Sequence, residues 1–528
     1  MHDVATLLGA AAVAHLLART WGVPPTPLLL IAGLAAARTL HLTDAFLEDA
    51  VVLGASFLLF TGGMELSGRR VGRQASAAFR VGTSQFVALG LLGFLAGGAL
   101  GYEPLEAAYL ALALTASSTL VGIRLLKRRR QMFEPFGRLV LGVLLLQDLL
   151  VLIAIPIVLA LAMGNRAGWT GAAGVALLAA LTWAARRWVG PQLARVEDEP
   201  ELVLLAALTL LFAFLGIGAW MGIPLVVGAF LAGVALSSFP VDGMVRSVVT
   251  PISDFFAAIF FTALGALVVT PTLPQIAQAA LLAVGVILVT VPLVTVLAIR
   301  SGLSTRPAVE AGLMLAQTSE LSLALGLTGM LAGHIRPEVF TVIALVTVGT
   351  MLLTPVLSTD RVALGLAHRI PQRSPGEASS LQDHVLVLGA GSTGSLLLED
   401  LILADCRLVV VDDDPSLAAR VREAGIQVVR GNASDPRVLA AAGAGEARLI
   451  ISTLHHPRDV ETLLEMVDDV PVLVRVFDEP EAEWMRARGG EPVLFHEASA
   501  HGLLEWTREE SAELDQSLSD RLPAAPES

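Results

Sequence analysis

The chain has little charge and only one cysteine. Charged side chains make up 16% of its 528 residues and hydrophobic side chains 55%, which excludes an ordinary soluble protein, where about 25% of residues are charged. The single cysteine, Cys406, excludes an intrachain disulfide and suits a cytoplasmic segment, where we expect it to pack at the start of a strand. The net charge of −13 argues against nucleic-acid binding, which needs a basic patch.

Apolar runs fill the first ~360 residues and recur at about 20 residues, the length that spans a bilayer. They predict a polytopic α-helical membrane protein with about 13 spans. The N-terminus lacks a basic leader, so we expect no cleavable signal peptide. The expected spans are 4–20, 25–40, 47–66, 77–100, 105–126, 137–162, 169–188, 200–219, 222–238, 252–270, 274–299, 308–333 and 337–358.

Basic residues are distributed unevenly between the two sides of these spans. One side holds only Arg38, Arg166 and Arg336, and the other holds many more. The side rich in Lys and Arg is normally cytoplasmic. An odd number of spans then places the N-terminus outside and the C-terminal part inside. The basic side includes Arg124, Lys127, Arg246, Arg300 and Arg306.

The composition changes after the last apolar run. A Pro-, Gly- and Ser-containing segment follows and is typical of a linker, and beyond it the pattern is that of an α/β Rossmann-like domain. The acidic C-terminal end predicts a flexible tail. The expected parts are a membrane domain (1–360), a linker (361–382), a nucleotide-binding domain (383–505) and the tail (506–528).

A single acid, Asp148, lies in the middle of the apolar helix 139–156. A charge at the bilayer centre costs at least ~2.5 kcal/mol, and such residues usually carry an ion or a proton. The alternative is a structural acid that is hydrogen-bonded inside the bundle. Glu65 and Asp254 lie near span ends, where water can reach them, which favours a merely structural interpretation of both.

Two spans carry polar clusters that a lipid-facing helix would not. Non-helical backbone at membrane depth is tolerated only where it is buried or lines a cavity, and paired interruptions mark the site of an inverted-repeat transporter. We therefore expect broken helices in spans five and twelve, with spans one to six and eight to thirteen as the repeats. Alternatively, the Ser and Thr hydroxyls of these clusters only hydrogen-bond to their own helix or to neighbouring helices. The clusters are Thr115, Ser117, Ser118 and Thr119, and Gln317, Thr318, Ser319 and Glu320.

The segment Thr347-Val348-Gly349-Thr350 resembles a potassium-channel filter fragment. A filter needs a re-entrant loop repeated fourfold around a pore. This segment lies inside a continuous expected span, which disfavours a channel.

The C-terminal domain carries a dinucleotide-binding pattern. A strand at 384–388 leads into Gly389-Ala390-Gly391-Ser392-Thr393-Gly394 and a helix, and the strand 407–411 ends at Asp412. Such glycines let a pyrophosphate approach the helix N-terminus, and the acid binds ribose hydroxyls. NAD(H), AMP or ATP is favoured over NADP. The candidate nucleotide-binding residues are Gly389, Gly391, Ser392, Thr393, Gly394, Asp412, Asp413, Asn432, Ala433, Asp435 and Thr453.

A membrane-anchored nucleotide-dependent oxidoreductase is the competing interpretation. It needs an acid–base group beside the nicotinamide, and only His455 and His456 offer one locally. This alternative leaves Asp148 and the broken spans unexplained, so the sequence favours a transporter over an enzyme.

Several motifs together resemble the Kef-type branch of the monovalent cation:proton antiporters. They are Ala116-Ser117-Ser118-Thr119, Leu146-Gln147-Asp148, Phe60-Thr61-Gly62-Gly63-Met64-Glu65-Leu66, Gly228-Ala229-Phe230-Leu231-Ala232-Gly233 and Gln317-Thr318-Ser319-Glu320-Leu321. The later strands resemble TrkA-N or RCK regulatory domains, although Gly431-Asn432 replaces the usual Gly-Asp.

The resemblance implies exchange of potassium for protons by alternating access, with sodium as the alternative cation. Asp148, Gln147 and the two polar clusters would form the ion site, and an adenine nucleotide would regulate transport. It also implies a homodimer in the lipid of a bacterial inner membrane, with a possible ancillary cytoplasmic regulator. A lone carrier acid and no Lys or Arg inside the cores of the spans indicate electroneutral exchange, although Glu320 could add a second titrating group.

Overall fold

The computed structural model divides the chain into two compact units, Met1–Arg369 and Ile370–Ser528. The described residues are 2–39, 43–65, 75–128, 131–132, 135–163, 165–193, 199–223, 225–237, 241–303, 305–367, 369–370, 382–412, 415–431, 433, 435–454, 460–467, 469–495 and 497. The expected acidic tail, His455 and His456 lie outside them.

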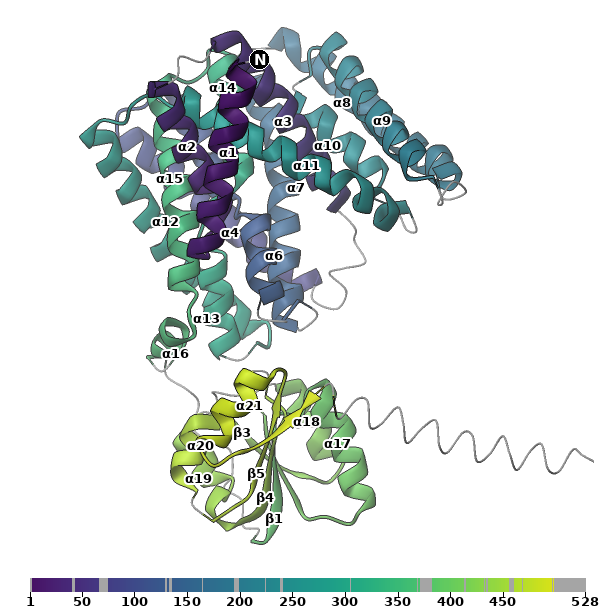
Figure 1. The fold of residues 1–528 in the computed structure, drawn as a ribbon, viewed down its shortest axis with the longest axis vertical. Helices are drawn as coiled ribbons and strands as arrows, with labels where there is room; N and C mark the ends of the chain where they lie inside the picture. Colours follow the sequence, from purple (N-terminus) through teal and green to yellow (C-terminus); the bar gives the residue numbers. More distant parts are fainter. Residues whose placement is uncertain are drawn as a thin grey trace, which may run out of the picture. The chain divides into compact units, whose positions relative to one another are not determined.

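The regular elements described in the first unit are all helices (Figure 1). Nine of its described helices are long and apolar enough to cross a membrane, and three shorter apolar helices accompany them. The helices are α1 (His2–Trp21), α2 (Pro25–Thr39), α3 (Asp44–Glu65), α4 (Ala75–Ala99), α5 (Pro104–Thr115), α6 (Thr119–Arg128), α7 (Pro135–Met163), α8 (Asn165–Leu193), α9 (Pro200–Trp220), α10 (Leu225–Ala235), α11 (Val241–Leu267), α12 (Leu273–Arg300), α13 (Thr305–Met314), α14 (Glu320–Leu331), α15 (Pro337–Leu357) and α16 (Asp360–Ala367).

These helices confirm the predicted polytopic fold with broken spans. The fifth expected span is split into α5 and α6, and the twelfth into α13 and α14. The tenth is longer than predicted, because α11 begins at Val241 and contains Pro251. Proline is tolerated inside membrane helices, where neighbouring groups satisfy the freed backbone. The extra turns bring Arg246 and Thr250 into the helix.

The membrane unit consists of two groups of helices. The panel bundle is α1, α2, α3, α9, α10 and α11, in which α3 packs closely on both α10 and α11, and α2 packs on α11. The core bundle is α4, α5, α6, α7 and α12–α15, in which α4 packs on α5, α7 and α12. Each half of the sequence gives three spans to each bundle, which is the arrangement expected of inverted repeats.

Reciprocal glycine crossings hold the panel bundle together. A Cβ added at Gly33 would lie 1.8 Å from the Thr262 carbonyl oxygen, and one at Gly265 would lie 2.1 Å from that of Leu30. The helices α3 and α10 repeat this relation. There, a Cβ at Gly63 would lie 2.2 Å from the Phe230 oxygen and one at Gly233 would lie 2.0 Å from the Phe60 oxygen. Small residues let membrane helices approach this closely.

Gly63→Ala is expected to destabilise the protein by about 1–3 kcal/mol, because the added methyl group would overpack the α3–α10 crossing. Its neighbour offers a matched control, since a Cβ at Gly62 would meet nothing within 4 Å. Thermal unfolding in detergent should therefore show a lower melting temperature for Gly63→Ala and no loss for Gly62→Ala. Equal melting temperatures would refute the tight crossing.

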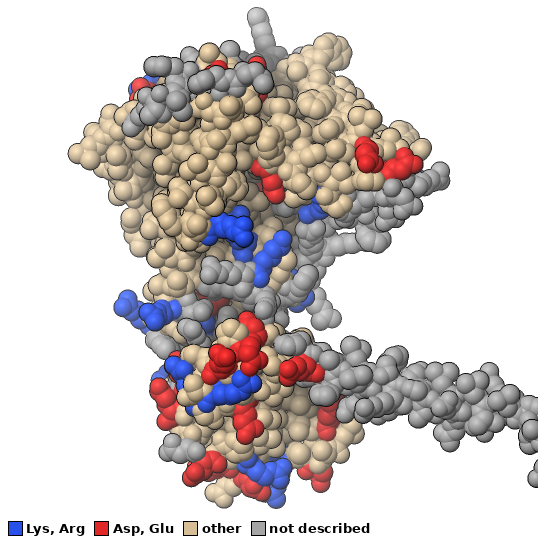
Figure 2. Space-filling model, viewed as in Figure 1, with Lys and Arg blue, Asp and Glu red and all other residues tan. Residues whose placement is uncertain are grey.

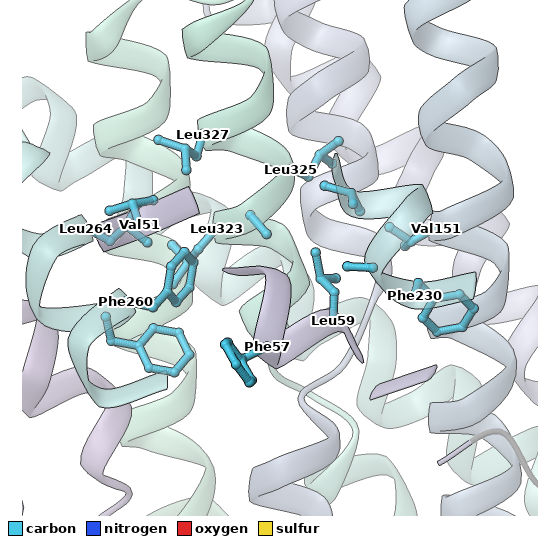
Figure 3. Close-up of a cluster of buried hydrophobic side chains, with 14 of the residues drawn as sticks. Val51, Phe57, Leu59, Val151, Phe230, Phe260, Leu264, Leu323, Leu325 and Leu327 are labelled. Atoms are coloured by element: carbon cyan, nitrogen blue, oxygen red, sulfur yellow. The ribbon is translucent and has the colours of Figure 1, made fainter. Parts of the chain in front are cut away.

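An apolar seam joins the two bundles (Figure 3). Val51 and Phe260 of the panel bundle belong to the same buried cluster as Val151, Leu323 and Leu327 of the core bundle. Each of these side chains is at most 4% exposed. No polar group is needed to pair across such a contact, so the bundles can separate there without leaving unpaired hydrogen-bonding groups.

The second unit is a parallel sheet in the order β3-β2-β1-β4-β5-β6. This order reverses direction between β1 and β4, which is where doubly wound folds bind ligands. The strands expected at 384–388 and 407–411 correspond to β1 and β2 to within one residue. The elements are β1 (His384–Leu388), α17 (Ser392–Leu403), β2 (Leu408–Asp412), α18 (Pro415–Glu423), β3 (Gln427–Arg430), α19 (Pro436–Ala441), η3 (Ala444–Glu446), β4 (Ala447–Ser452), α20 (Glu461–Met466), β5 (Val472–Val476), α21 (Glu479–Arg486) and β6 (Glu491–Leu494).

The buried pattern of the strands explains this sheet. All five residues of β1 and all five of β2 are buried, as expected for central parallel strands covered on both faces. Cys406 is half-buried just before β2 and packs against the cluster on one face of the sheet.

Candidate functional site

Hydroxyl side chains end and restart the two broken helices. Residues 116–118 and 315–319 are not helical. At the start of α6 the amide of Val121 donates to Ser118 Oγ at 3.2 Å, and at the start of α14 the amide of Leu321 donates to Ser319 Oγ at 3.1 Å. Serine oxygens satisfy free amides at helix N-termini in this way, so the polar clusters are the local cause of the breaks.

The two breaks lie against each other. The Ser117 hydroxyl donates to the Leu315 carbonyl oxygen at 2.8 Å, and the Ser118 hydroxyl donates to Glu320 Oε1 at 2.6 Å. Gln317 Nε2 donates to the Ser118 carbonyl oxygen at 3.4 Å. Segments almost 200 residues apart along the chain therefore form one buried polar centre.

Asp148 on α7 lies beside this centre. Thr119, the first residue of α6, donates its hydroxyl to Asp148 Oδ2 at 2.8 Å. The preceding residue, Gln147, is fully buried, and its Oε1 accepts the Ser117 amide at 3.0 Å. Asp148 itself is half-buried, so it keeps access to water.

The electrostatics of the centre suit both anionic side chains and a bound cation. The half-helices α6 and α14 begin at Thr119 and Glu320, and the positive end of a helix dipole favours a nearby carboxylate. The half-helices α5 and α13 end in the same region, at Thr115 and Met314. Unpaired carbonyl groups at such ends are the ligands that broken-helix transporters offer to cations.

A cavity of about 110 Å³ opens beside Asp148. The core bundle contributes Thr119, Asp148 and Glu320 to its walls. The panel bundle contributes Arg246 and Asp254, and the Arg246 guanidinium also donates to the Met64 carbonyl oxygen. Because a water occupies about 30 Å³ in the liquid, this space admits an ion together with a few waters.

The structure brings most of the predicted ion-site residues together. Thr119, Asp148, Ser319 and Glu320 line the cavity, whereas Ser117, Ser118, Gln147 and Gln317 lie behind them in the hydrogen-bonded crossing. Thr115 is different, because its hydroxyl donates at 2.7 Å to the Leu112 carbonyl oxygen within its own helix. A hydroxyl that only bonds back to its own helix, and does not bind an ion, is the alternative that the sequence left open.

Gln85 on α4 is a member of the centre that sequence reasoning missed. Its Nε2 lies 3.3 Å from Ser117 Oγ and 3.1 Å from the Leu315 carbonyl oxygen, so it reaches both breaks. Gln85 is fully buried. The only amide side chain in the expected span 77–100 was the signal that could have identified it.

The channel-like segment also has a role in this site. Thr347 and Thr350 of α15 are buried and hydrogen-bond to Thr318 in the second break, at 3.0 Å and 3.2 Å between hydroxyl oxygens. The segment is part of a continuous helix. It supports the broken helix and does not form a filter.

Basic residues reach deeper into the helices than the sequence indicated. Arg246 lines the cavity, and Arg306 on α13 is 6% exposed and lies 3.0 Å from Glu310 Oε1. The argument for electroneutral exchange concerned the cores of the spans, whereas Arg246 and Arg306 lie near the starts of α11 and α13, so electroneutral exchange stays a prediction. Arg246 lies within helix α11 because Pro251 does not interrupt it.

The glycine loop of the second unit has the geometry of a phosphate cradle. Gly389 has a φ of +90°, which favours glycine, and a Cβ at Gly394 would lie 2.1 Å from the Gly389 carbonyl oxygen. By contrast, a Cβ at Gly391 would meet nothing within 4 Å. Open space over this position is what the close approach of a pyrophosphate requires.

Two of the acids predicted to bind the nucleotide have protein partners. Asp412 Oδ2 accepts the Ala390 amide at 2.6 Å, so the acid that was expected to bind ribose also holds the glycine loop. Asp435 caps α19 and accepts from Arg437 Nη2 at 2.8 Å, which raises the pKa of Arg437 above its ordinary value. A helix cap is a sufficient reason for an acid at position 435.

The remaining predicted nucleotide-binding residues differ in their contacts and burial, and some lie outside the described residues. The Thr453 hydroxyl donates to the Gly389 carbonyl oxygen at 2.9 Å and so braces the loop from β4. Ala433 is buried. Asp413 and Asn432 lie outside the described residues, as do the side chains of Ser392 and Thr393.

Comparisons with known proteins match both units. Residues 5–359 match the family model "Sodium/hydrogen exchanger, transmembrane", and residues 385–495 match the TrkA-N domain. The chain is 27% identical over 502 residues to the putative K(+) efflux antiporter KefB of Alkalimonas amylolytica, covering 88% of this chain and 74% of that protein. It is also 27% identical to the glutathione-regulated potassium-efflux system protein KefC of Escherichia coli (strain K12), covering 79% and 69%.

A solved structure shares the fold of the membrane unit. The sodium proton antiporter MjNhaP1 from Methanocaldococcus jannaschii aligns with a TM-score of 0.54 at 18% identity, covering 70% of this chain and 99% of that chain.

Proposed function

Since the chain belongs to the sodium/hydrogen exchanger family and carries a C-terminal TrkA-N domain, it is a multi-span cation:proton antiporter, and we propose that Asp148 exchanges potassium for protons. It is a transporter rather than an enzyme, as the sequence predicted. His455 and His456, on which the oxidoreductase alternative depended, lie outside the described residues.

One observation carries the proposal for the site. Asp148 lies in a cavity, at hydrogen-bonding distance from the first residue of a broken helix. A carboxylate in such a place can hold either a proton or a cation, and the two compete for it. Ser319 and Glu320, which line the same cavity, complete the oxygen-rich wall that replaces part of the hydration shell of the cation.

The positions of cavity and seam along each helix support alternating access. On α11, Arg246, Thr250 and Asp254 line the cavity, whereas Phe260 and Leu264 pack in the seam. On α14, Glu320 faces the cavity, whereas Leu323 and Leu327 pack in the seam. In this proposal the site is open at one end of the bundles and closed at the other. Movement of the core bundle against the panel bundle would close the open end and open the closed one.

The open end is the cytoplasmic one in this proposal. The cavity lies toward the predicted cytoplasmic ends of α3 and α11, and on the face seen in Figure 2 the Lys and Arg side chains of the membrane unit gather toward α6 and α13. Lys and Arg mark the cytoplasmic side of membrane proteins. This orientation puts the TrkA-N domain in the cytoplasm and the N-terminus outside.

Regulation by an adenine nucleotide is the second part of the proposal. The open space over Gly391 and the strained turn at Gly389 leave room for a pyrophosphate at the N-terminus of α17. AMP, ATP and NAD(H) all present such a group or a phosphate. A nucleotide shifts transport only if it binds the transport states unequally. Pairing of two chains in a bacterial inner membrane, with or without an ancillary cytoplasmic regulator, would let one domain act on its partner.

Potassium is expected to drive exchange at a lower concentration than sodium. The relatives at 27% identity are named for potassium efflux, and Gln147 is tied to the Ser117 amide, so its carbonyl oxygen is held back from a small ion. Initial rates of cation-driven proton flux in proteoliposomes would give both apparent KM values. A lower apparent KM for sodium than for potassium would show that sodium is the preferred cation, and the proposed antiport reaction would still stand.

A further inference from the structure

We propose that Asp254 gives the cytoplasm-facing state a higher cation affinity than the outward-facing state, an inference that rests on the exchange function proposed for Asp148. The sequence alone favoured a merely structural role for Asp254, because it lies near an expected span end. The structure instead places it in the wall of the cavity that holds Asp148.

Asp254 lies in a different bundle from Asp148. It lies on α11 in the panel bundle, whereas Asp148 and Glu320 lie on α7 and α14 in the core bundle. Its side chain is exposed, so water and ions reach it. The cavity wall therefore joins carboxylates from the two bundles that are expected to move against each other.

The charge around Asp254 also matters. The basic side chains that interact electrostatically with Asp254 from other helices are His15 on α1 and Arg124 on α6, and Arg246 lines the same cavity. Among the described residues that line it, three carboxylates and one guanidinium thus face the space. A cleft lined mainly by one sign of charge raises the local concentration of the opposite ion.

The attraction of Asp254 for the cation differs between the two transport states. A carboxylate on the core bundle accompanies the bound ion through the transport cycle, but one on the panel bundle stays behind. Asp254 therefore adds its attraction only while the cavity faces the end where Asp254 lies. In the opposite state the ion would lose this attraction and dissociate more readily, which favours the outward release of a cation taken from inside.

Asp254→Asn should raise the apparent KM for potassium on the cytoplasmic side by about two- to tenfold, the order expected when one nearby charge in a partly hydrated cavity is lost. Everted vesicles present this side to the bath, and right-side-out vesicles present the other. We expect the KM to rise in everted vesicles alone, with little change in the maximal rate. Asp254→Glu should restore the wild-type value.

Two controls separate this effect from a structural one. Glu201→Gln removes an exposed acid at the start of α9, outside the cavity, and should leave both KM values unchanged. Inert salt should shrink the ratio of variant to wild-type KM, because exposed charges are screened. A folding defect would lower the maximal rate in both vesicle types and would not respond to salt.

The result that overturns the proposal is a wild-type KM on the cytoplasmic side, or an equal rise on both sides, in Asp254→Asn. Asp148→Asn in the same vesicles shows which idea has failed. If that variant loses exchange while Asp254→Asn is normal, only the role of Asp254 is refuted. If it retains exchange, the site proposed at Asp148 is itself wrong.

Discussion

Asp148→Asn is expected to reduce cation-driven proton flux in proteoliposomes to the level of protein-free liposomes. Asparagine keeps the size of the side chain and an oxygen that can still accept the Thr119 hydroxyl, now 2.8 Å from Asp148 Oδ2. It loses the negative charge and the proton, and both are needed if one group carries the two ions in turn. The buried crossing of Ser117, Ser118 and Glu320 does not depend on that charge.

Two comparisons make this prediction sharp. Asp148→Glu should retain part of the flux with an altered pH dependence, because a carboxylate remains but is displaced by a methylene group. Glu201→Gln should behave as the wild-type protein. Wild-type flux in Asp148→Asn would show that the carrier is another group, and Glu320, which also lines the cavity, would then be the first candidate.

Gly391→Leu is expected to abolish nucleotide binding to the TrkA-N domain. A Cβ added at this position would meet no protein atom within 4 Å, so the domain should still fold, and the rest of the leucine side chain would fill the space that a pyrophosphate needs. Calorimetric titration of the purified protein with AMP, ATP and NADH would measure the loss. Flux at a fixed ion gradient should then no longer respond to added nucleotide.

Other glycines of the same domain provide the contrast. A Cβ at Gly445 also meets nothing within 4 Å, and Gly445 lies in η3, away from the loop after β1, so Gly445→Leu should bind nucleotide normally. Gly394→Ala is a poor test, because its Cβ would lie 2.1 Å from the Gly389 carbonyl oxygen and disturb the fold. Suppose that Gly391→Leu loses nucleotide binding while its flux stays equal to that of the wild-type protein, both with and without nucleotide. That result would show that the domain serves assembly or stability rather than regulation.

The sequence predicted the broken helices because their cause is local. Serine and threonine oxygens can satisfy free helix amides, and two clusters in corresponding spans indicate a repeat before any contact is known. The glycine loop and Asp412 were predictable for the same reason, since a strand, a turn and a helix are adjacent in the chain.

The rest of the site depends on contacts between distant segments. Gln85 reaches Ser117 and Leu315 across 32 and 230 residues of sequence, and nothing near Gln85 in the chain indicates either partner. Arg246 belongs to the cavity only because α11 continues through Pro251, and Asp254 belongs to it because α11 packs on α3. Proline is an ambiguous signal in membrane helices, where neighbouring groups compensate for its missing amide hydrogen.

The central claim is that one carboxylate holds either a proton or a potassium ion, and proton release on potassium binding tests it most directly. Potassium chloride would be added to weakly buffered, detergent-solubilised protein containing a pH indicator, with choline chloride as the ionic control. The wild-type protein should release protons that saturate with potassium, and Asp148→Asn should release none. Potassium binding without proton release in the wild type, or equal release from Asp148→Asn, would contradict the account.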